Sequence, residues 1–156
     1  MSIQYSAVGA TTVIVVGGEP PSDEAWKKLV DWFAQRAEVG DLRVLWVSHG
    51  AAPDAATRQA LVDRGLRVTA GRVACVTESR LARGAAAAMS WFLDYPLECF
   101  TPDEAERALA HLEIDEADRA RLREAVGAHE EELGLGRRLL EDFRSRRTPL
   151  QFRPES

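Results

Sequence analysis

Two short polar segments hold the side chains of this chain that could do chemistry. They are Ser48-His49-Gly50 and Thr77-Glu78-Ser79-Arg80, and each directly follows an apolar run. A serine hydrolase combines a hydroxyl nucleophile, a histidine base and a carboxylate that orients the base. These residue types are present as Ser48 or Ser79, His49 and Glu78, so hydrolysis is the first hypothesis to weigh.

The spacing of these residues argues against a hydrolase. Ser48 would lie beside its own base, and neighbouring side chains on a strand point to opposite faces. The chain also contains no GxSxG nucleophile elbow. Helix capping explains the second segment better, because Thr77 and Ser79 are good caps and Glu78 complements the positive end of a helix dipole. We therefore expect no catalytic residue and predict that the protein is not an enzyme.

Motifs for metals and cofactors are also lacking. Cys75 and Cys99 lie in separate apolar runs and the three histidines are scattered, so neither a zinc site nor a redox dithiol is predicted. Buried reduced thiols are favoured, with a disulfide as the alternative if the two strands are neighbours. Gly17-Gly18 fits no phosphate-binding motif, and the acidic Glu19 follows it. We expect no metal and no cofactor.

Composition points to one soluble domain with additions. The chain has 156 residues, of which 46% are hydrophobic and 29% charged, and a formal net charge of -5. This length suffices for one core, and the charge argues against a nucleic-acid surface. The apolar run at residues 12–16 is far too short to span a bilayer, and no basic leader precedes it. We expect a cytoplasmic protein without a membrane span.

The two polar segments belong to a repeating strand-helix pattern. Apolar, β-rich runs predict five strands, and helical periodicity predicts four helices that alternate with them. The strands are expected at residues 3–8, 11–16, 43–47, 73–77 and 97–100, and the helices at 22–38, 53–65, 79–93 and 101–112. Three inward faces are predicted, one for each of the first three helices: Trp26, Leu29, Val30 and Phe33; then Ala56, Ala60 and Leu61; then Leu81, Ala85, Ala88 and Phe92.

These elements predict an α/β domain over residues 1–113. Strands that are apolar throughout and separated by helices indicate a five-stranded, mainly parallel sheet covered by the four helices. Gly9-Ala10 would join the first two strands in a hairpin, which makes the first strand an antiparallel edge. Gly65 is the expected C-cap of the second helix.

A helical extension is predicted at residues 114–147, followed by an extended tail at 148–156. Asp115 is a suitable cap, and the apolar residues behind it are spaced as a narrow seam. We call Leu122, Val126 and Leu133 the C-terminal seam. Gly134 and Gly136 interrupt it, so the extension is either a helical hairpin or one kinked helix. The seam either docks on the sheet domain or pairs with a second chain.

Three segments of the chain resemble the SpoIIAA-like branch of STAS domains, also described as STAS/SEC14-like. The segments are VIVVGGEPPSDEAWKKLVDWF, RVACVTESRLARGAAAAMSWF and CFTPDEAERALAHL, and the resemblance covers residues 3–112. It implies a non-enzymatic domain that binds protein partners, a nucleotide or a lipid-like ligand. Members that act as anti-sigma-factor antagonists carry a phosphorylated serine in a DxSG-like context. This chain has SHGAAPD there, and neither Ser48 nor Thr57 matches that motif.

Candidate binding residues follow from the predicted sheet. Ligands bind outside the carboxyl ends of the strands in open α/β sheets, which collects six polar residues on one rim: Ser48, His49, Thr77, Glu78, Ser79 and Arg80. Arg83 would help to hold an acidic group of a partner. Trp91 lies off the predicted inward face beside Met89, which suits a partner surface or an oily ligand.

The leading hypothesis is therefore a regulatory or scaffold domain that binds another protein, or itself, through the third helix and the extension. The alternative is a carrier of a small, hydrophobic, lipid-like ligand.

Overall fold

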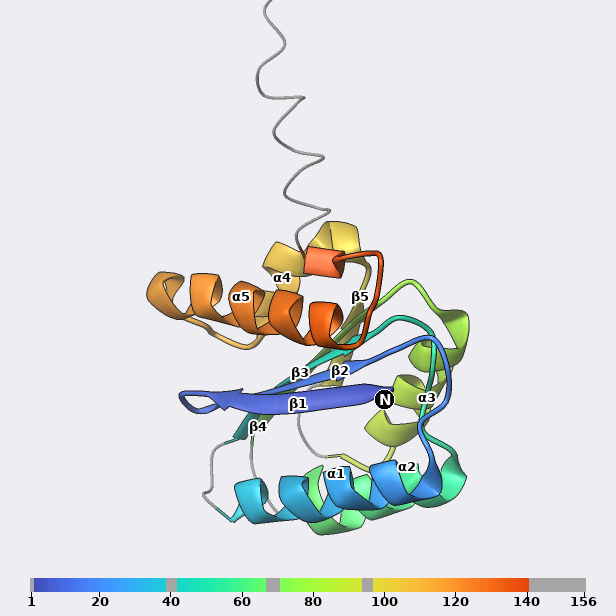
Figure 1. The fold of residues 1–156 in the computed structure, drawn as a ribbon. Helices are drawn as coiled ribbons and strands as arrows, with labels where there is room; N and C mark the ends of the chain where they lie inside the picture. The colour runs from blue at the N-terminus through green and yellow to red at the C-terminus, as the bar shows by residue number, and fades with distance from the viewer. Residues whose placement is uncertain (1, 39–41, 67–70, 94–96, 141–156) are drawn as a thin grey trace, which may run out of the picture.

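The fold is a five-stranded sheet with helices on both faces (Figure 1). The computed structural model describes residues 2–38, 42–66, 71–93 and 97–140. Strand β1 pairs antiparallel with β2, and the other neighbouring pairs are parallel, in the order β1-β2-β3-β4-β5. The strands are β1 (Ile3–Val8), β2 (Thr11–Val16), β3 (Leu42–Ser48), β4 (Gly71–Thr77) and β5 (Leu97–Phe100). The predicted sheet and its antiparallel edge are confirmed.

Five α-helices complete the described part of the chain. They are α1 (Asp23–Ala37), α2 (Ala55–Leu61), α3 (Arg80–Ser90), α4 (Ala105–His111) and α5 (Glu116–Glu132). A π-helical turn, η1 (Val62–Leu66), follows α2, and a 3-10 turn, η2 (Pro102–Glu104), precedes α4. Side-chain caps fix the starts of the first three, since Ser22, Asp54 and Ser79 accept hydrogen bonds from backbone N–H groups one turn on. Thr101 and Glu104 form a capping box at the start of the segment that leads into α4.

The connections explain which helices share a face. Each parallel connection moves one strand along the sheet in the same direction, so right-handed crossovers place α1, α2 and α3 on one face. Helices α4 and α5 cover the other face (Figure 1). Two apolar clusters result. One joins α1, α2 and α3 to Ile14, Val44 and Trp46, and the other joins α4 and α5 to Val13 and Leu45.

The predicted inward face of α1 is confirmed, but those of α2 and α3 are partly wrong. Ala56 is exposed and Ala60 only half-buried, because the buried surface of this segment continues into η1. Gly65 is part of that turn rather than a C-cap, and a Cβ there would lie 2.5 Å from the Phe33 ring. Helix α3 buries Ala82, Ala85, Ala86 and Met89 instead of the predicted set.

The error in α3 comes from the ends of the helix. Leu81 is next to the inward-facing Ala82, which places it about 100° around the helix, and it is 68% exposed. The helix ends at Ser90 rather than near residue 93, so the helical period does not extend to Phe92, which is 55% exposed.

The C-terminal extension forms, together with α4, the second helical layer of the fold. Leu122 and Val126 are 0% exposed and pack in the cluster of Val13 and Leu45, with the half-buried Leu133 against it. The two buried residues of the C-terminal seam are therefore covered by the chain's own sheet and offer no surface to a second chain.

The chain then reverses. Helix α5 ends at Glu132, Gly134 adopts a left-handed conformation with φ of 70°, and Leu139 and Leu140 return to the same cluster. A single kinked helix is therefore excluded for the described part of the extension. The predicted tail at 148–156 lies outside the described residues. Over the stretches that the structure describes, none of the helices has the length and apolarity needed to cross a membrane.

Candidate functional site

The hydroxyl groups of the predicted rim bond to the backbone. Strands β3 and β4 end side by side at Ser48 and Thr77. Ser48 Oγ donates to the Ala51 carbonyl at 2.7 Å, and Thr77 Oγ1 donates to the Ser48 carbonyl at 2.8 Å. Ser79 Oγ donates to the Gly50 carbonyl at 3.1 Å and also caps α3. These hydroxyls hold the loops together, which is a structural role.

The three roles of a serine hydrolase are not brought together. His49 Nε2 lies 2.5 Å from Glu130 Oε2 of α5, and Glu78 pairs with Arg137 in a two-pronged ion pair. Histidine and the predicted orienting carboxylate therefore have different partners. Ser79 caps α3 as expected, whereas Thr77 accepts the N–H of Ser79 at 3.0 Å and so supports the cap residue rather than the helix itself. Glu78 forms an ion pair that the sequence did not indicate.

Glu130 is the residue of this region that sequence reasoning missed. Its side chain is 1% exposed, and Oε2 accepts hydrogen bonds from His49 and from the Leu139 N–H at 3.0 Å. Its other oxygen, Oε1, is buried without a hydrogen-bond partner among the described residues. The signal was weak, because Glu130 stands in an acidic stretch, Glu130-Glu131-Glu132, that is typical of a solvated helix face.

The segment that follows α5 covers the rim. A Cβ on Gly17 would lie 3.7 Å from Leu135, and the Leu135 N–H donates to the Glu130 carbonyl. Together with the contacts of Leu139 and Arg137 described above, this places residues 135–140 over the carboxyl ends of the strands. The edge at which the sequence predicted a ligand is therefore partly covered by the chain itself, while Glu78 and Arg80 remain exposed.

Among the residues that the structure describes, the large apolar side chains that remain exposed lie on the outer surface of α3. Three large side chains lie there: Leu81, Trp91, which is 86% exposed, and Phe92. Gly84 and Ala87 are exposed between them. We call these five residues the α3 face. Arg80 is exposed at its N-terminal end, and Trp91 lies off the inward face, as the sequence indicated.

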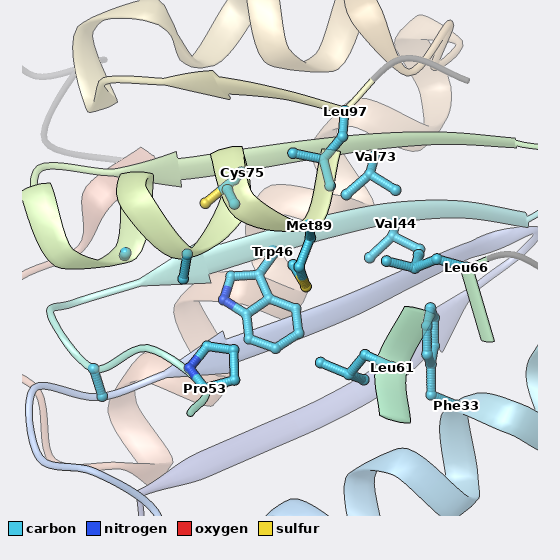
Figure 2. A pocket seen from close by; sticks show the side chains of 14 residues that line it. Phe33, Val44, Trp46, Pro53, Leu61, Leu66, Val73, Cys75, Met89 and Leu97 are labelled. Atoms are coloured by element: carbon cyan, nitrogen blue, oxygen red, sulfur yellow. The ribbon is translucent and has the colours of Figure 1, made fainter. Parts of the chain in front are cut away.

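Met89 does not belong to this surface. It is buried and lines an apolar cavity of about 30 Å³ between the sheet and helices α2 and α3 (Figure 2). Figure 2 shows Trp46, Cys75 and Leu97 around the same space. This volume suits one water molecule rather than an organic ligand, whose pockets measure about 300–1,000 Å³.

A shallower groove lies between α2 and α3. It has a volume of about 210 Å³ and is bordered by Phe92, Ala88, Val62 and the polar Arg58 and Gln59. The groove is continuous with the α3 face through Phe92. Apolar side chains, small residues and a positive edge thus meet on one side of the molecule.

Arg83 points inward rather than to solvent. Its Nη2 donates to the Thr77 carbonyl at 3.4 Å, and its Nε is buried without a hydrogen-bond partner in the described ranges. Cys75 of β4 and Cys99 of β5 are paired residues on these neighbouring strands, and both are free thiols. The strands are therefore neighbours, which the sequence left open, yet no disulfide is formed.

Other chemistry receives no support from the geometry. In the portions of the chain that the structure describes, His, Cys, Asp and Glu side chains form no group of three that could hold a metal ion. Trp26 and Trp46 are stacked in the core with ring centroids 6.2 Å apart, and the half-buried Trp32 lies on Tyr5 at 4.7 Å.

Comparison with known proteins gave one match. The family model described as SpoIIAA-like matches residues 12–113, which run from β2 to the end of α4. Neither the curated proteins nor the solved structures gave a match.

Proposed function

This chain belongs to the SpoIIAA-like family, and from that premise we propose that it is a non-catalytic regulatory or scaffold domain that binds another protein in the cytoplasm. The observation that carries the proposal is the α3 face, on which Leu81, Trp91 and Phe92 expose large apolar side chains. The domains of this family commonly interact with proteins and are generally non-catalytic.

The energetics favour burial of this face in a complex. Burying one large apolar side chain contributes about 1.5–3 kcal/mol, so three of them offset a substantial part of the cost of association. Trp is also among the residue types that dominate binding energy at interfaces. The small residues Gly84 and Ala87 form a shallow depression in the middle of the α3 face, into which the backbone of a partner could fit closely.

The edges of the α3 face indicate the chemistry of the partner. Arg80 lies at one end and Arg58 borders the groove near Phe92, so the rim is positive although the chain is negative overall. An amphipathic helix with apolar residues at helical spacing and acidic residues beside them complements this surface. We commit to such a helix on another protein as the occupant.

Affinity capture with the full-length protein tests this function. A Trp91→Ala/Phe92→Ala variant is compared with wild type and with Lys28→Ala, an exposed residue of α1. A partner, once identified and purified, should bind wild type and Lys28→Ala equally and the double variant at least about tenfold more weakly. Equal binding by all three proteins overturns the use of the α3 face.

Light scattering after size exclusion shows whether a second copy of this chain, rather than another protein, covers the α3 face. A dimer that the double variant splits would mean that a second copy of the chain covers the face. Monomeric protein that recovers no specific partner removes support from the interaction hypothesis altogether.

A carrier of a hydrophobic ligand is the second candidate, favoured by the apolar lining of the cavity in Figure 2. At about 30 Å³ the cavity is too small for such a ligand, so binding would require α3 to move away from the sheet. Native mass spectrometry of freshly purified protein should then show extra mass, and added fatty acid should change Trp46 fluorescence. A ligand-free mass and an unchanged spectrum count against this function.

A further inference from the structure

The two cysteines of the chain are close enough to react with each other. Cys75 of β4 and Cys99 of β5 are partners in the parallel ladder, and both side chains pack on the face covered by α3. Neighbouring strands are about 4.8 Å apart, which lies within the Cα–Cα range of about 4.4–6.8 Å that a disulfide spans. The two thiols also shift each other's pKa in opposite directions, upward for Cys75 and downward for Cys99.

The surroundings of the two thiols differ. Cys75 is buried and lines the apolar cavity, whereas Cys99 is half-buried on the edge strand. The hydrogen bond from Cys75 lowers the pKa of Cys99, burial opposes this, and the positive charge of Arg83 lowers it further. The pKa of Cys75 is raised well above the ordinary value, mainly by its hydrogen bond with Cys99 and, second, by burial. The reactive thiolate therefore forms on Cys99, the more exposed of the two cysteines.

Arg83 supplies an independent observation. Its Nε–H is buried without an acceptor in the part of the chain that the structure describes, and an unmade hydrogen bond of this kind costs about 1–3 kcal/mol. Native structures rarely leave such a donor without a reason. The anionic sulfur of Cys99, or an oxygen bonded to that sulfur, is the type of acceptor that this N–H lacks.

We propose that Cys99 and Cys75 are a peroxide-reactive dithiol, in which a hydroperoxide oxidises Cys99 first and Cys75 then closes a disulfide between β5 and β4. The proposal does not depend on the function of the α3 face. It revises the expectation from sequence that the chain has no redox dithiol, because that expectation rested on the separation of the cysteines along the chain.

Both steps balance. The Cys99 thiolate attacks one oxygen of the hydroperoxide, the O–O bond breaks, and the other oxygen leaves as an alcohol or water after taking up a proton. Cys99 is then a sulfenic acid. The Cys75 sulfur attacks the Cys99 sulfur, the S–O bond breaks, and the hydroxyl leaves as water with the proton from Cys75. The two electrons lost by the thiols reduce the hydroperoxide.

Treatment of the reduced, full-length protein with hydrogen peroxide tests the pair. Wild type should lose the mass of two hydrogen atoms, become resistant to thiol alkylation, yield a peptide that links residues 75 and 99, and recover with dithiothreitol. Cys75→Ser should stop at a sulfenic acid on Cys99 that a dimedone probe traps. Wild type oxidised at Cys99 without a disulfide, or not oxidised at micromolar peroxide, overturns the proposal.

The contribution of Arg83 has its own control on the same helix. Arg83→Gln should slow the oxidation of Cys99 about three- to tenfold, because a cation near a thiol favours the thiolate, whereas Arg80→Gln should leave the rate unchanged. Circular dichroism confirms that both variants are folded. Should a variant fail to fold, alkylation of the wild type decides the order: Cys99 must react at least about tenfold faster than Cys75, and the reverse order refutes the assignment.

Discussion

Helices α3 and α5 were both predicted from sequence to contact partners, and the structure separates them. Helix α5 carries few apolar residues and buries Leu122 and Val126 completely against the sheet. Helix α3 packs on the sheet through alanines and Met89. Leu81 in its first turn and Trp91, the residue after its end, remain exposed. A narrow seam is therefore enough over β1 and β2, because α4 covers the same sheet face over β4 and β5. Helix α3 has more apolar residues than its contact with the sheet can bury, and the remaining ones lie on the surface.

Removal of α5 should have the largest effect on this comparison. A chain truncated after Leu112 would expose the face of the sheet formed by Val13, Leu45 and their neighbours, which α5 covers. We expect an aggregated protein or one without a cooperative unfolding transition, because an exposed sheet face of this kind is an aggregation site. Solubility and thermal melting measured by circular dichroism check this.

The matching change on α3 is the Trp91→Ala/Phe92→Ala variant in the full-length chain. It should remain soluble and unfold cooperatively, since both side chains lie on the surface. A truncated chain that is soluble and unfolds cooperatively would mean that α5 is an appendage rather than part of the second layer.

Single leucines on the two helices sharpen the same contrast. Leu122→Ala should lower the free energy of unfolding by about 2–5 kcal/mol, because it leaves a cavity in a packed cluster. Leu81→Ala should change it by less than about 0.5 kcal/mol, since the side chain is largely exposed. Urea denaturation followed by Trp fluorescence measures both. Equal losses would show that Leu81 is buried in solution, for instance by self-association.

Lowering the pH should destabilise the folded protein through His129 of α5. Its Nε2 lies 2.8 Å from Ser6 Oγ of β1, and its Nδ1 is buried without a hydrogen-bond partner in the described segments. Burial lowers the pKa of His129 below the ordinary 6.5, and the charge of Glu132 opposes this shift. The unfolded chain therefore takes up the proton at a higher pH than the folded protein does.

The free energy of unfolding should consequently fall as the pH drops below about 6.5, by at most about 1.4 kcal/mol per pH unit from this group. The fall ends below the pKa of the folded state, where both states carry the proton. Urea denaturation between pH 7.5 and 5 should show a smaller loss in His129→Gln than in wild type. Identical slopes for the two proteins would contradict the assignment.

Much of the fold could be read from local chemistry. Ser79 caps α3 where the sequence placed it, and the spacing from Trp26 to Phe33 gave the buried side of α1. The sequence also held the clue to the role of α5. Strand β3 is buried on both faces, and crossovers in one direction cover only one of them, so a later helix had to cover the other.

The site was less predictable because its contacts depend on how distant elements are arranged. The approach of Glu130 to His49 depends on the position of α5 across the sheet, and the pairing of Cys75 with Cys99 depends on the strand order. Neither follows from spacing along the chain. Helix ends were the other weakness, since Phe92 was assigned to a period that stops at Ser90.

The ion pair of Glu78 and Arg137 should have the smallest effect, and it measures how firmly residues 135–140 hold the rim. Both side chains are more than a third exposed, so solvent screens their attraction. A double-mutant cycle with Glu78→Gln and Arg137→Gln should give a coupling energy of about 0.2–1 kcal/mol at low salt that decreases at 1 M salt, where the Debye length is about 3 Å. A coupling above about 2 kcal/mol that salt does not reduce would mean that the pair is shielded from solvent. Residues 135–140 would then be held on the rim as strongly as α5 is held on the sheet. The contrast with the exposed α3 face would be larger than the structure alone indicates.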